Sequence, residues 1–144
     1  YQPEIVLTNA LHDRHPDHGR AGDLANDPIF LSGLRRIETQ LDGVAQTAWR
    51  PRLVLQYIQD RYIEPDVIID ITDFMETKLA AIRALKTQFD SPDNKEPQTY
   101  ISSPEFLEAV ISRAREFGKS VGATYAEGFT SRKLLGVDSL FNLR

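Results

Sequence analysis

Three short runs of apolar and β-branched residues, separated by helix-like patterns, constrain the fold of this chain most strongly. They are EIVLT at 4–8, RLVLQYI at 52–58 and DVIIDIT at 66–72, and each has the composition of a strand. Strands that alternate with helices are typical of an α/β layer structure. We therefore predict an α/β fold with a mostly parallel sheet, in which 4–8 is buried on both faces, 66–72 is central and 52–58 lies nearer an edge.

Two helical patterns follow the first and the last of these runs. Apolar residues recur at helical spacing over 19–34, and Pro28 interrupts that pattern, so we expect two helical pieces there. A second apolar stripe covers 75–89 and predicts one continuous amphipathic helix. Asp73 and Glu76 have the spacing of a capping box at its start.

A third helix is predicted near the end of the chain. Ser103 provides an N-cap, Pro104 suits the first turn, and Glu105 is favoured by the helix dipole. Gly118 or Gly122 can end this helix. The segments outside these patterns are a polar stretch at 90–98, expected to be a surface loop, and an apolar tail at 125–143, expected to pack against the rest.

Composition limits the classes of protein that the chain can represent. Its 144 residues, 41% of them apolar, suit one globular domain. The net charge is −4 and the basic residues are scattered, which argues against a nucleic-acid partner. No apolar run is long enough to span a membrane, so we expect a soluble protein with no membrane partner. The absence of cysteine excludes disulfides and thiolate zinc sites and fits a reducing cytoplasm.

All three histidines of the chain fall in one segment, TNALHDRHPDHGRAGDL at 8–24. This segment directly follows the first predicted strand, and ligands of open α/β sheets bind beyond the carboxyl ends of strands. His15 and His18 are separated by three positions with a proline between them, so both imidazoles can face one small volume. One imidazole can bind a transition metal while the other transfers protons, and Asp17 can orient a ring N–H.

A simpler interpretation of the same segment is a solvated loop in which Asp13 or Asp17 caps the following helix. Catalytic zinc generally takes three protein ligands, and this loop is too short to direct all its polar groups at one ion. Further ligands would have to come from elsewhere.

Three segments together resemble the C-terminal part of the LmbE/PIG-L type zinc N-deacetylases: DRHPDHGRA at 13–21, PDVIIDITDFMETKLAAIRALKTQF at 65–89 and REFGKSVGATYAEGF at 115–129. Within that family the chain looks most like the branch that deacetylates N-acetylglucosaminyl malate in bacillithiol synthesis. The resemblance implies a Rossmann-like three-layer sandwich with a mostly parallel sheet, here incomplete at the N-terminus. Residues 1–144 would then be the C-terminal portion of a single LmbE-like deacetylase domain.

The resemblance also implies roles for individual residues. His18 would ligate Zn²⁺, His15 would act as general acid or oxyanion stabiliser, and Asp17 would orient His15. Arg14, a candidate for substrate binding, and His12 would be neighbours of the site. A zinc-bound water would then attack the acetamide carbonyl. The family also carries a His-Pro-Asp-Asp segment that supplies further ligands and the general base, and this sequence has no such segment. We therefore expect no activity from this polypeptide alone, and we expect it to need the missing N-terminal half of the same enzyme.

Two functional hypotheses follow. The first is zinc-dependent hydrolysis of the acetamide of an N-acetylglucosamine conjugate by a cytoplasmic homo-oligomer, as the resemblance implies. In it, Arg50 could clamp a substrate carboxylate such as that of malate, although a solvated arginine beside Trp49 explains that residue equally well. The alternative is a non-enzymatic interaction module, in which the histidine loop is only a cap and the amphipathic helices bind a partner.

Overall fold

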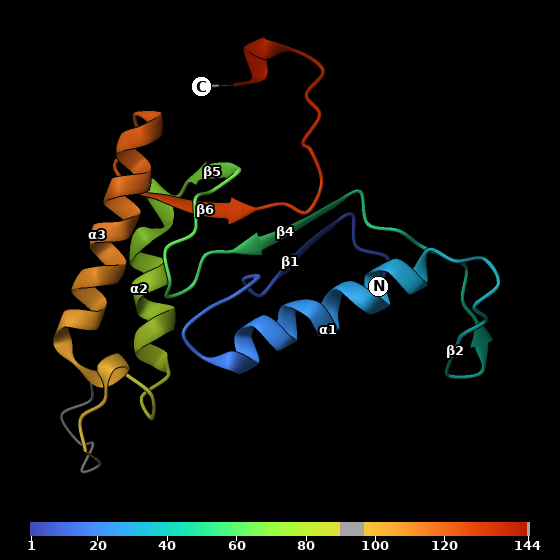
Figure 1. The fold of residues 1–144 in the computed structure, drawn as a ribbon, viewed down its shortest axis with the longest axis horizontal. Coiled ribbons are helices and arrows are strands. Elements are labelled where there is room, and N and C mark those ends of the chain that lie inside the picture. The colour runs from blue at the N-terminus through green and yellow to red at the C-terminus, as the bar shows by residue number, and fades with distance from the viewer. Residues whose placement is uncertain (90–96, 144) are drawn as a thin grey trace. The chain divides into compact units, whose positions relative to one another are not determined.

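A computed structural model of the chain describes residues 1–89 and 97–143 (Figure 1). These residues form two compact units. The first unit comprises Tyr1–Val67 and Gly128–Leu143, and the second comprises the described part of Ile68–Glu127. Most of the loop predicted at 90–98 lies outside the described residues. No helix in the described ranges is both long and apolar enough to cross a membrane.

The sheet contains four strands in the order β1-β4-β6-β5, and its strands are Ile5–Thr8 (β1), Leu53–Tyr57 (β4), Val67–Asp70 (β5) and Ala126–Thr130 (β6). β1 and β4 are parallel, with Thr8 opposite Gln56, whereas β4 and β6 are antiparallel, with Gln56 opposite Thr130. A separate hairpin consists of β2 (Gln40–Leu41) and β3 (Val44–Ala45). Together with the helices, this sheet confirms the predicted α/β fold class.

Three predictions about the strands are wrong in detail. β1 is covered on one face only, because Ile5 and Leu7 are 51% and 55% exposed while Thr8 is buried. β5 lies at one end of the strand order and β4 lies inside it, the reverse of the expected arrangement. The cause is β6, whose AEGFT sequence was not recognised as a strand and which hydrogen-bonds to β4. Apolar composition identifies a strand, but it does not specify which partner that strand pairs with.

The first helix, α1 (Pro16–Ser32), is continuous through Pro28, so the prediction of two helical pieces is wrong. Proline has a backbone torsion close to the helical value, and inside a helix it removes one hydrogen bond without forcing the helix to end. α1 also lies close to the loop that follows β1. A Cβ atom at the buried Gly22 would be 3.0 Å from the carbonyl oxygens of Asn9 and Ala10. The absence of a side chain at Gly22 therefore allows this close approach.

The second unit is held together by packing between α2 (Met75–Ala84) and α3 (Pro104–Val121), which run side by side in Figure 1. Met75 and Leu79 of α2 form a buried cluster with Ala114 of α3. The partly buried residues around this cluster are Ile71, Leu107, Ile111 and Tyr125. Short 3₁₀ turns occupy Thr72–Phe74, Tyr100–Ser102 and, in the first unit, Leu140–Asn142.

The ends of these two helices only partly match the predictions. α3 ends at Val121 and is capped by Gly122, which has a left-handed φ of 70°, as expected for a glycine at this position. α2 ends five residues before Phe89, whose ring instead stacks on Phe106 at 5.3 Å between centroids. The predicted capping box is also wrong, because a 3₁₀ turn precedes α2 and its N-cap, Phe74, makes no side-chain capping hydrogen bond.

Substitution of Gly118 by alanine tests the packing of α3 against the residues that follow it. A Cβ at Gly118 would lie 2.7 Å from the carbonyl oxygen of Ala123 and 3.0 Å from that of Thr124. We expect the free energy of unfolding to fall by about 1–3 kcal/mol despite the higher helix propensity of alanine. Urea denaturation measures this change. Gly136→Ala is the control, since nothing lies within 4 Å of its added Cβ; equal losses in the two variants would contradict the prediction.

Candidate metal and proton-transfer site

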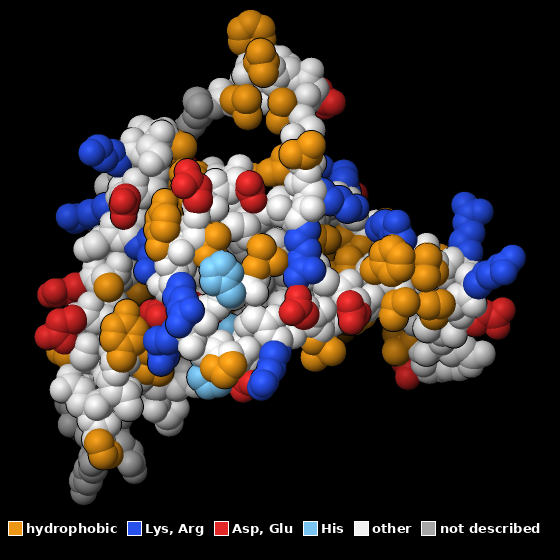
Figure 2. Space-filling view, in the orientation of Figure 1, with side chains coloured by type: hydrophobic (Ala, Val, Ile, Leu, Met, Phe, Trp, Pro, Cys, Tyr) orange, Lys and Arg blue, Asp and Glu red, His pale blue; other side chains and the backbone are white. Residues whose placement is uncertain are grey.

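The candidate site lies in the first unit, where the loop after β1 (9–15) approaches the segment after β4 (58–61). β1 and β4 are parallel, so their carboxyl ends share one edge of the sheet, which is the usual location of ligands in open α/β folds. The histidine loop therefore occupies the position that its place in the sequence predicts. Histidine side chains are visible at the surface in Figure 2, with both acidic and basic side chains around them.

The carboxylate of Asp13 joins the two segments. Its side chain is fully buried, and its Oδ1 accepts hydrogen bonds from the backbone N–H groups of Asp60 at 3.1 Å and Arg61 at 2.8 Å. Burial alone would raise the pKa of the Asp13 carboxyl. The N–H groups of Arg61, Arg14 and Asp60 and the imidazole of His18 outweigh burial and hold this pKa below its usual value. Asp13 is therefore ionised at neutral pH.

The second oxygen of Asp13 fixes the orientation of His18. Oδ2 lies 2.5 Å from Nδ1 of His18, and an ionised carboxylate can only accept, so Nδ1 carries the proton. The lone pair of a neutral His18 is then on Nε2, which lies 3.5 Å from the side-chain nitrogen of Gln59. A carboxylate that holds the other ring nitrogen is the usual arrangement behind a metal-binding histidine.

His15 has the opposite arrangement of its ring nitrogens. It is the N-cap of α1, and its Nδ1 accepts a hydrogen bond from the backbone N–H of Asp17 at 3.2 Å. A neutral His15 therefore carries its proton on Nε2. The two imidazoles are 5.5 Å apart between ring centroids and tilted by 38°. One ring thus offers a lone pair and the neighbouring ring offers a proton, which suits metal binding beside proton transfer.

Asp17 and Arg14 complete the set of predicted residues in this region. The carboxylate of Asp17 is 3.7 Å from Nδ1 of His15, so its backbone N–H, rather than its side chain, forms the hydrogen bond to that ring. Arg14 forms an ion pair with Asp60, with 3.4 Å between Nε and Oδ2. The alternative of an aspartate cap for α1 is wrong, because His15 occupies the N-cap position.

Arg50 is not brought to the histidines. It lies three positions before the start of β4, at the opposite end of the parallel β1–β4 pair from the histidine loop. Its guanidinium donates to the carbonyl oxygen of Phe30 at 3.4 Å and lies 5.4 Å from the centroid of the Phe30 ring. The geometry therefore supports a packing role against α1, and a role for Arg50 in substrate binding remains a prediction.

Three residues of the site were missed by sequence reasoning: Asp13, considered only as a cap, and Gln59 and Asp60, not considered at all. A usable signal was present, since 59–61 directly follows the strand predicted at 52–58 and parallel strands bring such segments to one edge.

The described residues provide only part of a metal site. Within 1–89 and 97–143 no three histidine, aspartate or glutamate side chains are grouped so that they could hold a metal ion. Nε2 of His18 is a suitable ligand, whereas both oxygens of Asp13 already accept hydrogen bonds. The described side chains therefore supply one imidazole ligand for a transition metal. Catalytic zinc generally takes three protein ligands, so the described residues do not complete such a site.

Comparison with known proteins identifies deacetylases among the relatives of this chain. No protein-family model matches it. The chain is 32% identical over 133 residues to the diacetylchitobiose deacetylase of Thermococcus kodakarensis. The matched region covers 88% of this chain and 44% of that relative, so the chain spans less than half of the relative's length. The prediction of a deacetylase-related chain is confirmed at this level.

Solved structures share the fold. The conserved protein TT1542 from Thermus thermophilus matches 95% of the chain and 56% of its own length, with a TM-score of 0.75 and 28% identity. The N,N'-diacetylchitobiose deacetylase of Pyrococcus horikoshii matches 89% of the chain and 45% of its own length, with a TM-score of 0.66 and 28% identity. GalB, a 4-carboxy-2-hydroxymuconate hydratase from Pseudomonas putida, has a TM-score of 0.69 at 21% identity and covers 96% of the chain and 56% of its own length. The similarity to GalB supports only the fold assignment, because proteins with one fold can catalyse different reactions.

Asp13→Asn tests the carboxylate that organises the site. The pKa of Asp13 is lowered in the folded state, so its contribution to stability is complete above the unfolded-state pKa, about 3.9, and is lost as pH falls through the folded-state pKa. At pH 7 we expect the free energy of unfolding of the variant to be about 1–3 kcal/mol lower than that of the wild type. This difference should shrink as the pH falls below about 4. Denaturant titrations at several pH values measure this difference. Asp138→Asn, at an exposed position, should have little effect; a loss for Asp13→Asn that does not change with pH would contradict the account.

Proposed function

We propose that this chain takes part in the hydrolytic N-deacetylation of an acetylated sugar. The observation that carries the proposal is the buried Asp13 carboxylate, which directs the Nε2 lone pair of His18 away from Asp13, toward the Gln59 amide at 3.5 Å and beside His15. Homology to a diacetylchitobiose deacetylase supports the reaction class. Because the chain spans less than half of that relative, the activity belongs to the proposal for the whole protein.

Zinc is the proposed cofactor, with His18 as one ligand and the remaining ligands outside the described residues. When bound, zinc would polarise the acetamide carbonyl and activate water. Asp13 would keep Nε2 of His18 directed as a ligand and increase its basicity. His15 would protonate the departing amine from Nε2 as an imidazolium, whose Nδ1–H would face the Asp17 carboxylate 3.7 Å away instead of accepting from the Asp17 N–H.

The substrate we propose is N-acetylglucosaminyl malate, the substrate of the bacillithiol branch that the sequence resembles. The resemblance to that branch is the support for an anionic substrate; Arg14 of the histidine loop is ion-paired with Asp60, so it would have to exchange this carboxylate for that of the substrate. The substrate in the names of the relatives, diacetylchitobiose, is uncharged. Preference for the malate conjugate over diacetylchitobiose would therefore support this substrate, and the reverse preference would exclude it without excluding deacetylation.

His18→Ala is the direct test of the metal ligand. In the natural protein that contains this chain, we expect the variant to lose zinc and acetate release together, because no other described imidazole is held by a buried carboxylate. Metal analysis and an acetate assay on the same sample provide the measurement. His12→Ala, in the same loop, is the matched control and should keep its zinc. A His18→Ala protein with full zinc content would overturn the proposal, and partner binding without deacetylation by any metal-loaded form would favour an interaction module.

His15→Gln separates proton transfer from metal binding. Glutamine can still accept the hydrogen bond from the N–H of Asp17 but cannot act as an acid, so zinc content should be unchanged. Turnover should fall about 10²- to 10⁴-fold, the usual contribution of a general acid. Unchanged turnover at full zinc content would assign the proton to another residue.

A further inference from the structure

A cavity of about 490 Å³ lies in the first unit, and no residue of the histidine loop lines it. Its walls are the second half of α1 (26–30), the start of β4 with the residues before it (50–54), and the segment after β6 (131–136). These three segments can be followed in Figure 1. The residues at 50–54 lie at the amino end of β4, whereas Gln56 lies near its carboxyl end, opposite Thr8; no residue of the loop at 9–15 or of the segment at 58–61 lines the cavity. The cavity is therefore separate from the candidate deacetylase site.

The cavity contains a buried amide without a partner. Gln56 lines it and is 0% exposed, yet neither its Oε1 nor its Nε2 forms a hydrogen bond with any described residue. The neighbouring Thr130, opposite Gln56 in the sheet, has an equally unpartnered hydroxyl. Buried polar groups in folded proteins nearly always have a partner, so an orphan donor and acceptor beside a cavity indicate a polar molecule bound there.

The charged residues around the cavity indicate that the bound molecule carries a negative charge. Arg50, Arg52, Arg132 and Lys133 line the cavity, against Asp27 as its one acidic residue among those described. Arg132 is paired with Asp23, whereas Arg52 and Lys133 form no ion pair within the described residues. The remaining lining is largely apolar and includes Ile29, Phe30, Leu53, Val54, Leu134 and Leu135. An anion with an apolar body matches both features.

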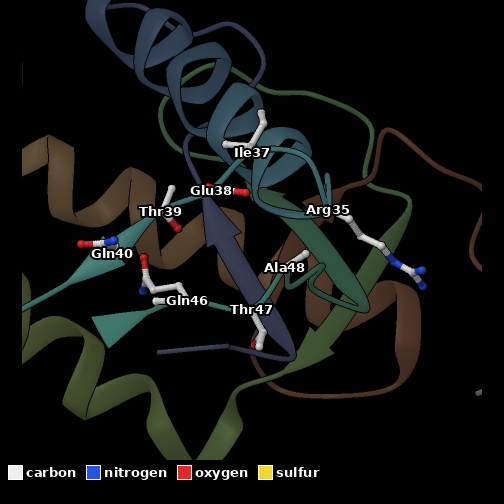
Figure 3. Close-up of a pocket in the computed structure, with 9 residues that line it drawn as sticks. Arg35, Ile37, Glu38, Thr39, Gln40, Gln46, Thr47 and Ala48 are labelled. Carbon is white, nitrogen blue, oxygen red and sulfur yellow. The ribbon is translucent and has the colours of Figure 1, made fainter. Parts of the chain in front are cut away.

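The first unit has another hollow, and it is a weaker candidate. It has a volume of about 650 Å³ beside the β2–β3 hairpin. Figure 3 shows Thr39, Gln40 and Gln46 around it and the Arg35 guanidinium directed away from them. These are exposed side chains, and none of the residues that line it carries a buried polar atom without a partner.

We propose that the cavity beside Gln56 binds a small organic carboxylate with an apolar body. The carboxylate pairs with the unpaired cations Arg52 and Lys133, since guanidinium groups bind carboxylates in a bidentate manner. The apolar body packs on the side chains of Phe30 and Leu53, and the amide of Gln56 bonds a polar group of the ligand or a water carried with it. The cavity volume lies within the range of small-molecule sites.

Calorimetric titration of 4-phenylbutyrate into the natural protein that contains this chain tests this proposal. The uncharged analogue, 4-phenylbutanamide, is titrated in parallel. We expect saturable binding of the acid and at least about tenfold weaker binding of the amide. Arg52→Gln and, independently, Gln56→Leu should each weaken binding of the acid. Arg36→Gln is the matched control, because it removes the same charge from an exposed position outside the cavity.

Three results would overturn the proposal: no saturable binding of 4-phenylbutyrate, equal affinity for the two analogues, or equal losses for Arg52→Gln and Arg36→Gln. His18→Ala must leave the binding unchanged, since a loss there would place the probe in the histidine loop. Because this binding requires neither zinc nor turnover, its failure and the failure of the deacetylase proposal are distinguishable.

Discussion

The buried carboxylate of Asp13 is the group on which the candidate site depends. It accepts N–H groups from the segment after β4 through one oxygen and the ring of His18 through the other, so it links the chain after two different strands. The parallel register of β1 and β4 brings those segments to the same edge. The orientation of one histidine is thereby coupled to the pairing of the sheet, and a metal ligand with a fixed orientation loses less entropy on binding.

Sequence reasoning recovered the parts of the structure that local pattern controls. The strand at 4–8 and the C-terminal glycine of α3 follow from β-branched composition and from the left-handed cap, both of which are local. The order of the strands does not follow from local pattern, because the paired residues of β4 and β6 are 72 and 74 positions apart in the chain. The role of Asp13 was missed for the same reason, since its N–H partners lie 47 and 48 positions away.

The relatives show that this fold does not by itself determine which reaction a protein catalyses. Deacetylases and a hydratase share this architecture, so the reaction must be decided by the side chains at the edge of the sheet. In this chain those side chains form a pair of imidazoles with opposite tautomers, one held by a carboxylate and the other by a helix N-terminus. That pair suits hydrolysis of an amide, in which a metal-bound nucleophile and a proton donor act on the same bond.

The tautomeric state of His18 tests this account most directly. Long-range ¹H–¹⁵N correlation NMR of the histidine rings distinguishes a protonated nitrogen from one with a free lone pair. The account predicts a proton on Nδ1 of His18 and a free lone pair on its Nε2 near neutral pH. A neutral His18 with its proton on Nε2 would contradict the account. Such a ring could not donate a hydrogen bond from Nδ1 to Asp13 and at the same time offer the Nε2 lone pair to a metal.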